Sequence, residues 1–270
     1  MSGIIIKYKN VNYKIVLIGA GNVATQLSFT LQKAGHTIVQ VYSKHPSSAI
    51  ALSKSLKCAY TDSLKAIDKT ADIYIIAVKD DAIAEVAKQL NLKDKIVVHT
   101  SGSVELNVLK PVTKNYGVFY PLQTFSKTNK INFKGVPVCL EAGNIATLNT
   151  LVSLAGSISN NVQKINSEQR RIIHLAAVFA CNFSNHLYAI AENILIYNDL
   201  SLDILKPLIE ETAKKIKYAS PSKVQTGPAI RNDKRTMDNH LKMLKYNNSY
   251  QQLYKLLSKS IIDLNKQKKQ

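Results

Sequence analysis

The sequence has little cysteine and no cysteine–histidine pattern. Its three cysteines, Cys58, Cys139 and Cys181, are widely spaced, and no paired Cys or His spacing accompanies them. An odd, scattered set excludes both a disulfide framework and a zinc site of ordinary spacing. We therefore expect a protein without a metal site that works in the reducing cytoplasm.

Long apolar runs and a signal sequence are also lacking. The richest apolar stretch, IIHLAAVFACNF, is interrupted by His174 and Asn182, so it predicts a buried helix rather than a membrane span. The first residues contain no basic region followed by an apolar core, which predicts that there is no signal peptide. With 46% hydrophobic and 20% charged residues, the chain has the composition of a soluble globular protein.

Arginine is rare, although the chain is strongly basic. Of its 36 Lys and Arg residues only four are Arg, which leaves 32 Lys, and the formal net charge is +18. The Lys residues are spread along the whole chain, whereas binding to nucleic acid needs a localised basic stripe. We therefore expect no nucleic-acid partner. Arg170 and Arg171 are adjacent, and Arg231 and Arg235 share the segment QTGPAIRNDKR.

The sequence opens on a strand, a glycine turn and a helix. Residues 14–18, KIVLI, form a continuous apolar run that is typical of a strand covered on both faces. In GAGNVA, Gly19 permits a tight turn, Gly21 lets a pyrophosphate approach the backbone, and Ala24 lets the helix pack closely. The alternative is a structural turn that binds nothing. The predicted cofactor-binding residues at this helix N-terminus are Gly19, Ala20, Gly21, Asn22 and Val23.

The end of the second predicted strand, residues 36–43, favours NADP over NAD. An acidic residue there would bind the ribose 2′-hydroxyl of NAD. This chain instead has Ser43, Lys44 and His45, and a hydroxyl with a cation suits a 2′-phosphate. We predict that NADP is the cofactor and that Ser43 and Lys44 bind it. The alternative is that Lys44 is one more surface lysine in a lysine-rich chain.

Strands and helices continue to alternate up to residue 165. Further strands are predicted at residues 71–78, 94–99, 116–125, 136–142 and 161–165, and helices at 79–90 and 144–156. In a doubly wound sheet the carboxyl ends of the strands line the cofactor crevice. The nicotinamide half of the cofactor is therefore predicted to be flanked by two strand ends, residues 77–79 and residues 99–103. The named residues of these segments are Ala77, Val78, Lys79, His99, Thr100 and Ser101.

From residue 166 the pattern becomes helical. Residues 166–195 contain no Gly or Pro, and Asn166 or Ser167 can cap them. Their middle is apolar on nearly all sides, which predicts that this helix is buried, either within the chain or between two subunits. Three more helices are predicted at residues 201–217, 232–245 and 249–266, with Pro207 bending or breaking the first. The fold class is thus α/β, with a doubly wound Rossmann-type sheet in residues 1–165 and an all-α domain in residues 166–270.

Polar residues interrupt the long helix along one stripe. His174, Val178 and Asn182 are spaced at i, i+4 and i+8, so they would lie on one face of an α-helix. Polar groups in an apolar stretch need partners. Either His174 and Asn182 bond a neighbouring backbone, or they face the cleft above the nicotinamide.

The order of motifs over nearly the whole chain resembles a known family. A Gly-rich domain is followed by HTSGS, YPLQTF, RRIIHLAAVFACNF and TGPAIRND. The chain resembles the Rossmann-like NADP oxidoreductases whose C-terminal part is a domain of unknown function. They are related to the 6-phosphogluconate dehydrogenase, ketopantoate reductase and pyrroline-5-carboxylate reductase superfamily. The resemblance implies a homodimer formed through the C-terminal helices and hydride transfer between C4 of the nicotinamide and a C=O or C=N carbon.

The chain departs from this family at two positions. In several relatives the long helix carries a Lys and, four residues later, an Asn. Here the Asn position is Asn182, but the Lys position is Val178. Close members also have a His before the Pro of the YPLQTF segment, where this chain has Tyr120. Both departures leave open an alternative function, an NADP-binding sensor or scaffold dimer without catalysis.

The catalytic hypothesis is an oxidoreductase that acts on a small anionic carbonyl or imine compound. Arg231 would clamp the anion because a guanidinium offers a planar fork that Lys lacks, and Ser101, Ser103 and Asn182 would bond polar groups of the substrate. His174 is the first candidate for the proton donor that neutralises the developing charge, and His99 is the second.

The segment around Arg231 has features of its own. Gly227 and Pro228 predict a turn that directs Arg231 toward the site. Asp233 either buttresses Arg231 or caps the following helix.

Overall fold

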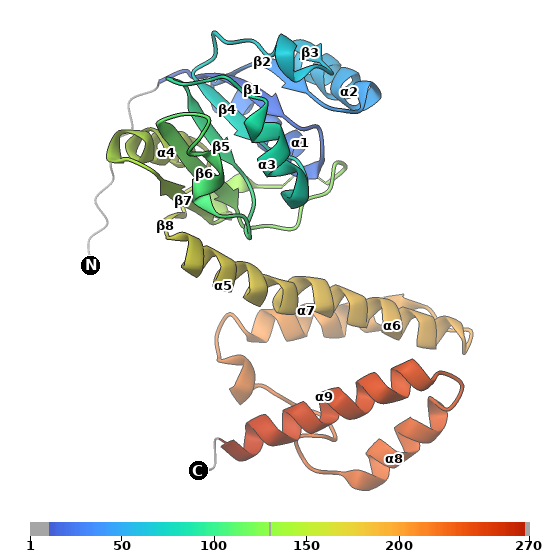
Figure 1. Cartoon of the computed structure of the whole chain (residues 1–270). Coiled ribbons are helices and arrows are strands. Elements are labelled where there is room, and N and C mark those ends of the chain that lie inside the picture. Colours follow the sequence, from blue (N-terminus) through green and yellow to red (C-terminus); the bar gives the residue numbers. More distant parts are fainter. Residues whose placement is uncertain (1–10, 130, 268–270) are drawn as a thin grey trace. The chain divides into compact units, whose positions relative to one another are not determined.

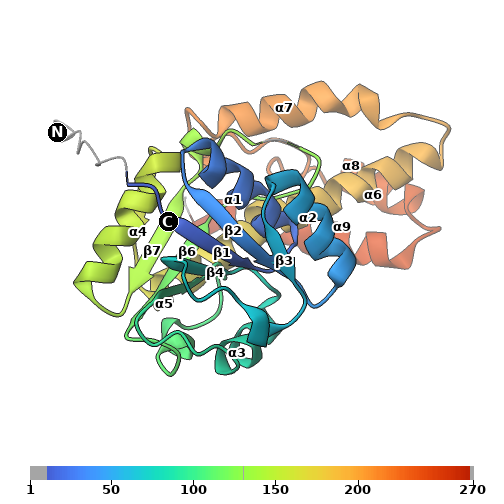
Figure 2. The same ribbon diagram turned by 90° about the horizontal axis from the view of Figure 1, so that it is seen from above.

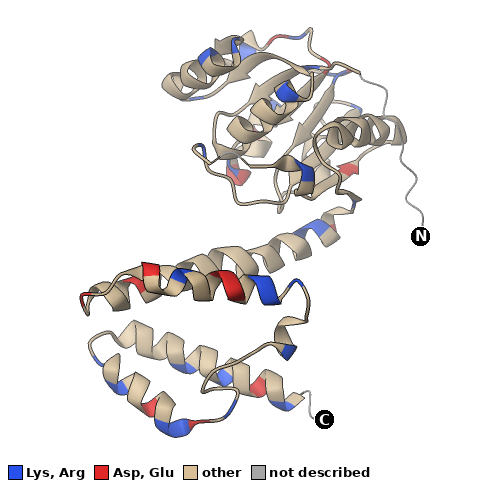
Figure 3. Cartoon of the chain, turned by 180° about the vertical axis from the view of Figure 1, so that it is seen from behind, with Lys and Arg blue, Asp and Glu red and all other residues tan. Residues whose placement is uncertain are grey.

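The computed structural model of the chain describes residues 11–129 and 131–267, so the expected absence of a signal peptide concerns residues outside this range. The chain divides into two compact units, the first ending at Cys181 and the second beginning at Asn182 (Figure 1). The boundary placed after residue 165 follows the change from strands to helices, and it stays a prediction. Lys and Arg occur along the helices of both units (Figure 3).

The first unit is built on one eight-stranded sheet with the order β3-β2-β1-β4-β5-β6-β7-β8. Neighbouring strands are parallel except β6 and β7, which are antiparallel. The chain leaves β1 in one direction for β2 and β3 and in the other for β4 and β5, which is the doubly wound order predicted from the sequence. The strands are β1 Lys14–Ile18, β2 Thr37–Tyr42, β3 Ala59–Thr61, β4 Ile73–Ile76, β5 Ile96–His99, β6 Asn115–Pro121, β7 Val138–Ala142 and β8 Val162–Lys164.

Helices cover both faces of this sheet. They are α1 Asn22–Lys33, α2 Pro46–Leu56, α3 Asp80–Lys88 and α4 Ile145–Ile158. Alternate side chains of β1 point to opposite faces: Ile15 and Leu17 pack with α1, α2 and α4, whereas Val16 and Ile18 pack with α3 (Figure 2). Burial on both faces explains why the strands read as continuous apolar runs. Because β1, β4, β5 and β6 run parallel to one another, their carboxyl ends lie along one edge of the sheet.

The long helical segment begins as predicted and then changes its winding. The side chain of Asn166 accepts the N–H of Gln169, whose side chain accepts the N–H of Asn166, which forms a capping box. Helix α5, Ser167–Ala177, continues into a π-helical segment, Val178–Phe183, and then into α6, Ser184–Ile196. The predicted i, i+4, i+8 stripe assumed α-helical winding throughout, and the wider π turn makes that spacing wrong between Val178 and Asn182.

The prediction that this helix is buried is wrong for the single chain. Ile172, Leu175 and Phe179 keep 61%, 60% and 63% of their surface exposed. The segment is apolar, as the sequence indicates, but more than half of each of these three side chains stays exposed in the described chain. Burial between two subunits stays a prediction.

The second unit contains α6, α7 Lys206–Lys215, α8 Lys234–Met243 and α9 Asn248–Gln267. A 3₁₀ turn over Leu202–Leu205 precedes α7, and Pro207 lies in the first turn of α7, so it marks a break rather than a bend. Tyr197 stacks on Tyr246 with ring centroids 4.4 Å apart, which joins the end of α6 to the segment before α9. Among the described helices, none combines the length and the apolar character that crossing a bilayer requires.

Candidate active site

The glycine turn between β1 and α1 brings the chain against the end of β4. Gly19 has φ +127°, and a Cβ atom there would lie 2.3 Å from the carbonyl oxygen of Ala77. The N–H of Gly19 donates to Tyr42 O at 2.8 Å, and the N–H of Ala77 donates to Ile18 O at 2.8 Å. Only glycine can therefore occupy this point, where β1, β2 and β4 meet.

The next glycine leaves open space in front of a helix N-terminus. Gly21 is the N-cap of α1, and a Cβ atom on it would meet nothing within 4 Å. The first turn of α1 holds no acidic residue, so its free N–H groups and positive dipole end can receive an anion. Ala24 is fully buried against the sheet. This cradle fits the pyrophosphate of a dinucleotide, and the predicted residues Ala20, Asn22 and Val23 lie within the same turn.

The side chain of Asn22 is used within the protein. Its amide donates to Phe125 O at 2.9 Å, and Gln26, one turn further along α1, donates to Ser126 O and Asn129 O at 2.6 and 2.9 Å. The segment after β6 is thereby held against α1. Phe125 also stacks on Phe133, with ring centroids 5.6 Å apart.

Both strands that flank β1 end in predicted cofactor-binding residues. Ser43 follows β2, is nearly buried, and accepts the N–H of His45 on its Oγ at 3.2 Å. Lys44 is exposed beside it, and α2 begins two residues later with no acidic residue in its first turn. Residues 77–79, Ala77, Val78 and Lys79, follow β4. The chain thus brings the two predicted coenzyme segments to the two sides of the glycine turn.

His99, at the end of β5, is fully buried. Its Nδ1 accepts the N–H of Ser101 at 3.2 Å, so the ring proton of the neutral form is on Nε2. Burial, helped by the positive charge of Arg170, lowers the pKa of His99 to about 3. The ring is therefore neutral near pH 7, and its contact with Ser101 fixes the turn that follows β5. Thr100 is also nearly buried, and its N–H donates to Ile76 O at 3.1 Å.

The two serines after His99 have defined donor and acceptor roles. The Oγ of Ser101 accepts the N–H groups of Ser103 and Val104, each at 3.0 Å. The Oγ of Ser103 donates to Oδ2 of Asp80, the first residue of α3, at 2.5 Å. Because the hydroxyl proton of Ser103 goes to Asp80, the hydroxyl of Ser101 can donate to Oγ of Ser103, 3.4 Å away, or to a ligand in its place. The sequence pattern gave no indication that Asp80 takes part in this turn.

Tyr120 and His174 form a pair next to this turn. The hydroxyl of Tyr120 lies 3.1 Å from Nδ1 of His174, and the rings meet edge to face with centroids 6.1 Å apart. A Cβ atom on Gly102 would lie 2.7 Å from the same Nδ1 and 2.8 Å from Cζ of Tyr120, so the loop touches both rings. Burial raises the pKa of Tyr120 to about 12, and its hydroxyl therefore stays protonated near neutral pH. His174 was predicted; its bond to Tyr120 was not.

The remaining predicted site residues, Asn182 and Arg231, belong to the second unit, and both are exposed there. Gly227 has φ +108°, as the predicted turn requires, and Asn232 also lies in the left-handed region. Asp233 caps α8: its Oδ1 accepts the N–H of Thr236 at 3.1 Å. Of the two alternatives for Asp233, the cap is the one present, and no ion pair to Arg231 occurs among the described residues.

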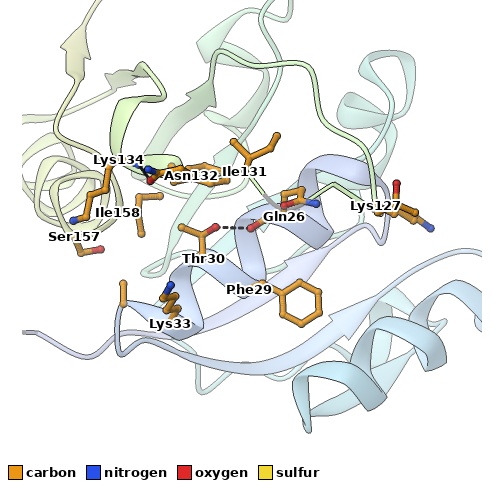
Figure 4. Close-up of a pocket in the computed structure, with 13 residues that line it drawn as sticks. Gln26, Phe29, Thr30, Lys33, Lys127, Ile131, Asn132, Lys134, Ser157 and Ile158 are labelled. Atoms are coloured by element: carbon orange, nitrogen blue, oxygen red, sulfur yellow. Dashed lines mark hydrogen bonds between the residues drawn. The ribbon is translucent and has the colours of Figure 1, made fainter.

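A separate pocket of about 920 Å³ lies beside α1 (Figure 4). It is lined by one face of α1, by residues 127–128 and 131–134 and by the end of α4, and Lys33, Lys127 and Lys134 lie around it. None of the predicted site residues lines this pocket. This pocket is therefore separate from the predicted cofactor-binding and catalytic residues that lie at the carboxyl ends of the strands.

Two family descriptions match parts of the chain. Residues 14–102 match the family described as NADP oxidoreductase coenzyme F420-dependent, and residues 136–261 match a domain of unknown function, DUF2520. Among curated proteins, no sequence matches the chain.

Solved structures extend these matches to nearly the full length. A provisionally assigned NADP oxidoreductase from Bacteroides fragilis is 43% identical, with 94% of this chain and 100% of that chain covered and a TM-score of 0.90. A protein from Thermotoga maritima is 22% identical, with 95% and 100% covered and a TM-score of 0.71. A pyrroline-5-carboxylate reductase from Coxiella burnetii is 16% identical, with 95% and 98% covered and a TM-score of 0.55.

The last two similarities concern the fold alone, whereas the first extends to sequence over the whole length. The resemblance drawn from the glycine turn and the helical motifs is thereby confirmed. The chain belongs to the same NADP oxidoreductase family as its Bacteroides fragilis relative.

Proposed function

We propose that this oxidoreductase uses NADPH to reduce the C=O or C=N group of a small anionic compound, with His174 as the proton donor. The observation that carries the proposal is the hydrogen bond between Tyr120 and His174, which lies against Gly102 in the loop after β5. In a doubly wound sheet, ligands bind at the carboxyl ends of the strands next to the switch point. The pair is at that edge of the sheet.

NADP is the proposed coenzyme, with its pyrophosphate on residues 19–23 and its 2′-phosphate on Ser43 and Lys44. The exposed ammonium of Lys44 and the acid-free start of α2 support a phosphate there rather than a bare ribose. Ala77, Val78, Lys79, Thr100 and Ser101 would flank the nicotinamide half. When bound, the reduced coenzyme supplies the hydride.

The protein's own residues would then manage a proton and the substrate's charge. Because the pKa of Tyr120 is about 12, its hydroxyl can donate to Nδ1 of His174, which leaves the ring proton on Nε2. We propose that this Nε2 proton goes to the substrate as negative charge develops, while Nδ1 takes up a proton from solvent, so that the ring is not left as an anion. The Tyr120 oxygen then accepts the new Nδ1–H. His99 is neutral and fully buried, so we propose that it holds Ser101 in place rather than donating a proton. Ser101 would bond the substrate, whereas the substrate contacts expected of Asn182 and Arg231 stay predictions from the sequence.

A direct test is a coenzyme titration followed by a substrate panel. We expect NADPH to quench or shift the protein's fluorescence at lower concentration than NADH. We also expect NADPH to be oxidised with at least one member of a panel of cyclic imines and 2-oxo acids, or NADP+ to be reduced by a hydroxy acid in the reverse direction. A clear preference for NADH would overturn the assignment of Ser43 and Lys44. Binding of NADPH without oxidation by any panel member would contradict the catalytic proposal.

That last outcome would favour a coenzyme-binding sensor or scaffold dimer. One observation supports this second candidate: Val178 occupies the position at which several relatives carry a lysine. A valine can neither donate a proton nor orient a substrate through a hydrogen bond.

We further propose a homodimer formed through the C-terminal helices. Ile196, Tyr197, Ile204, Leu208 and Met243 are each more than half exposed, and only Ala229 and Leu244 count as buried apolar residues among the described part of the second unit. Large apolar side chains exposed in this number are typical of a unit that covers them against a partner. Light scattering of the purified chain is expected to give twice the mass of one chain, and a monomer at micromolar concentration would exclude this arrangement.

A cytoplasmic location also remains a proposal, supported by three unpaired cysteines.

A further inference from the structure

Arg170 and Arg171 are neighbours in sequence, but their surroundings differ completely. Arg170 is fully buried in the first unit, whereas the side chain of Arg171 keeps 46% of its surface exposed and pairs with the exposed Glu105. A fully buried arginine is unusual because removing its charge from water is costly unless a partner compensates. The contacts of Arg170 therefore carry information about what this position does.

The guanidinium of Arg170 joins three segments of the first unit. Its Nη1 forms an ion pair with Glu141, in β7, and its Nη2 donates to Val104 O, in the loop after β5, at 2.5 Å. The same Nη2 donates to Oγ of Ser167, the first residue of α5, at 3.1 Å. One planar fork thus connects a strand, a loop and a helix, and a lysine could not make these contacts together.

Ser167 and Glu141 close the network. Glu141 accepts the N–H of Ser167 on Oε1 at 3.0 Å and the hydroxyl of Ser167 on Oε2 at 2.8 Å. The Oγ of Ser167 also accepts the N–H of Leu106 at 3.3 Å, from the same loop that contains Val104. The start of α5 and residues 104–106 are consequently held at fixed positions relative to β7.

The start of α5 and residues 104–106 both lie close in sequence to residues that form or contact the Tyr120–His174 pair. His174 lies four residues after Arg170 on α5, so both side chains are on the same face of the helix. Gly102, two residues before Val104, touches His174 and Tyr120. In the sheet, Tyr120 pairs directly with Cys139, two residues from Glu141 on the same strand. Any shift of α5 relative to the loop or β7 would therefore change the distance between the two rings.

We infer that Arg170, with Glu141, is a positioning residue for the Tyr120–His174 pair. The inference deepens the proposed function and rests on it. A buried ion pair contributes little net stability compared with apolar residues of similar size, so its better-attested role is to specify one arrangement. An error of about 1 Å in the placement of a reacting group can cost about 10²-fold in rate, which gives such a device a measurable effect.

The test compares Arg170→Lys with Arg171→Lys in the full chain. The exposed Arg171–Glu105 pair joins the same helix to the same loop, so it is a matched control that differs in burial. Long-range proton–nitrogen NMR spectra report the state of each histidine ring, and the spectrum of His174→Gln assigns the His174 signals. We expect Arg170→Lys to move the Nδ1 signal of His174 toward the value of an imidazole without its tyrosine partner. Arg171→Lys is expected to leave that signal unchanged.

Turnover provides the second readout, with the panel substrate that reacts. We expect Arg170→Lys to lower kcat by about 10- to 100-fold while the Kd of NADPH stays within about twofold. Arg171→Lys is expected to keep wild-type values. An unchanged His174 signal together with unchanged kcat in Arg170→Lys would overturn the inference. Because the NMR measurement needs neither substrate nor coenzyme, an absence of turnover in the wild type would count against the proposed function alone.

If Arg170→Lys does not fold, Glu141→Gln replaces it, because glutamine keeps the shape and one acceptor oxygen but removes the charge. Its matched control is Glu105→Gln. We expect Glu141→Gln to shift the His174 signal in the same direction as Arg170→Lys would, and Glu105→Gln to leave it in place. An unshifted signal in folded Glu141→Gln would overturn the inference as well.

Discussion

Replacing His174 with Gln is expected to lower kcat by about 10²- to 10⁴-fold, the range that a positioned proton donor contributes. Glutamine has a similar reach and can still bond the Tyr120 hydroxyl, but it cannot give a proton to the substrate. The Kd of NADPH is expected to stay the same, because the proposed coenzyme residues are at the glycine turn and the ends of β2, β4 and β5. Stopped-flow or steady-state oxidation of NADPH measures the first quantity, and fluorescence titration measures the second.

The second unit offers a matched control for this change. His240, in α8, also bonds a tyrosine: its Nδ1 lies 2.8 Å from the hydroxyl of Tyr254, and the rings are again edge to face. His240→Gln makes the same exchange next to a tyrosine, at a place that is not part of the proposed proton path. It is expected to leave kcat within about twofold of wild type, whereas equal losses in both variants would point to a general effect on folding.

A substitution at Tyr120 tells whether this residue orients His174 or donates the proton itself. Tyr120→Phe keeps the ring and removes only the hydroxyl, so His174 remains able to give a proton but loses its orienting partner. A smaller loss of kcat than in His174→Gln is therefore expected. Since the pKa of Tyr120 is about 12, loss of its proton should not produce an alkaline fall in rate between pH 7 and 10. A loss as large as that of His174→Gln would make Tyr120 the donor instead.

The first half of the fold was accessible from the sequence because local signals and tertiary requirements agree there. The run Lys14–Ile18 is apolar throughout because helices cover both faces of the sheet, and Gly19 and Gly21 mark the turn. Helix α2 and strand β3 were not predicted. In α2 four serines weaken the apolar pattern, and β3 has three residues of which two are exposed. The direction of β7 also could not be read, because strand periodicity is the same in parallel and antiparallel pairs.

The candidate site was only partly accessible for a different reason. His174 could be found because it interrupts an apolar helix, and residues 99–103 because they follow a buried strand. The partner of His174 lies 54 residues away in the sequence, and nothing local in YPLQTF indicates that Tyr120 meets it. Likewise, the buried pair of Arg170 and Glu141 is 29 residues apart and depends on the antiparallel pairing of β6 with β7. Contacts of this kind are set by the tertiary fold rather than by periodicity.

Alanine at either glycine of the cofactor turn is expected to weaken coenzyme binding, but only the change at Gly19 is expected to lower stability strongly. Gly19→Ala places a Cβ atom 2.3 Å from Ala77 O at a φ of +127°, where side chains are strained. The change is therefore expected to lower the free energy of unfolding by about 3 kcal/mol. Thermal or urea denaturation monitored by circular dichroism measures this loss, and coenzyme binding should fall with it because the turn itself must move.

Gly21→Ala is the informative partner, because its Cβ atom meets nothing within 4 Å and its φ of −82° suits alanine. Stability is expected to stay within about 1 kcal/mol of wild type, the ordinary cost of alanine at an N-cap. The added methyl group nevertheless occupies the space through which a pyrophosphate reaches the backbone, so the Kd of NADPH is expected to rise about tenfold or more. A stable Gly21→Ala protein that binds NADPH with wild-type affinity would show that the phosphates do not rest on this turn.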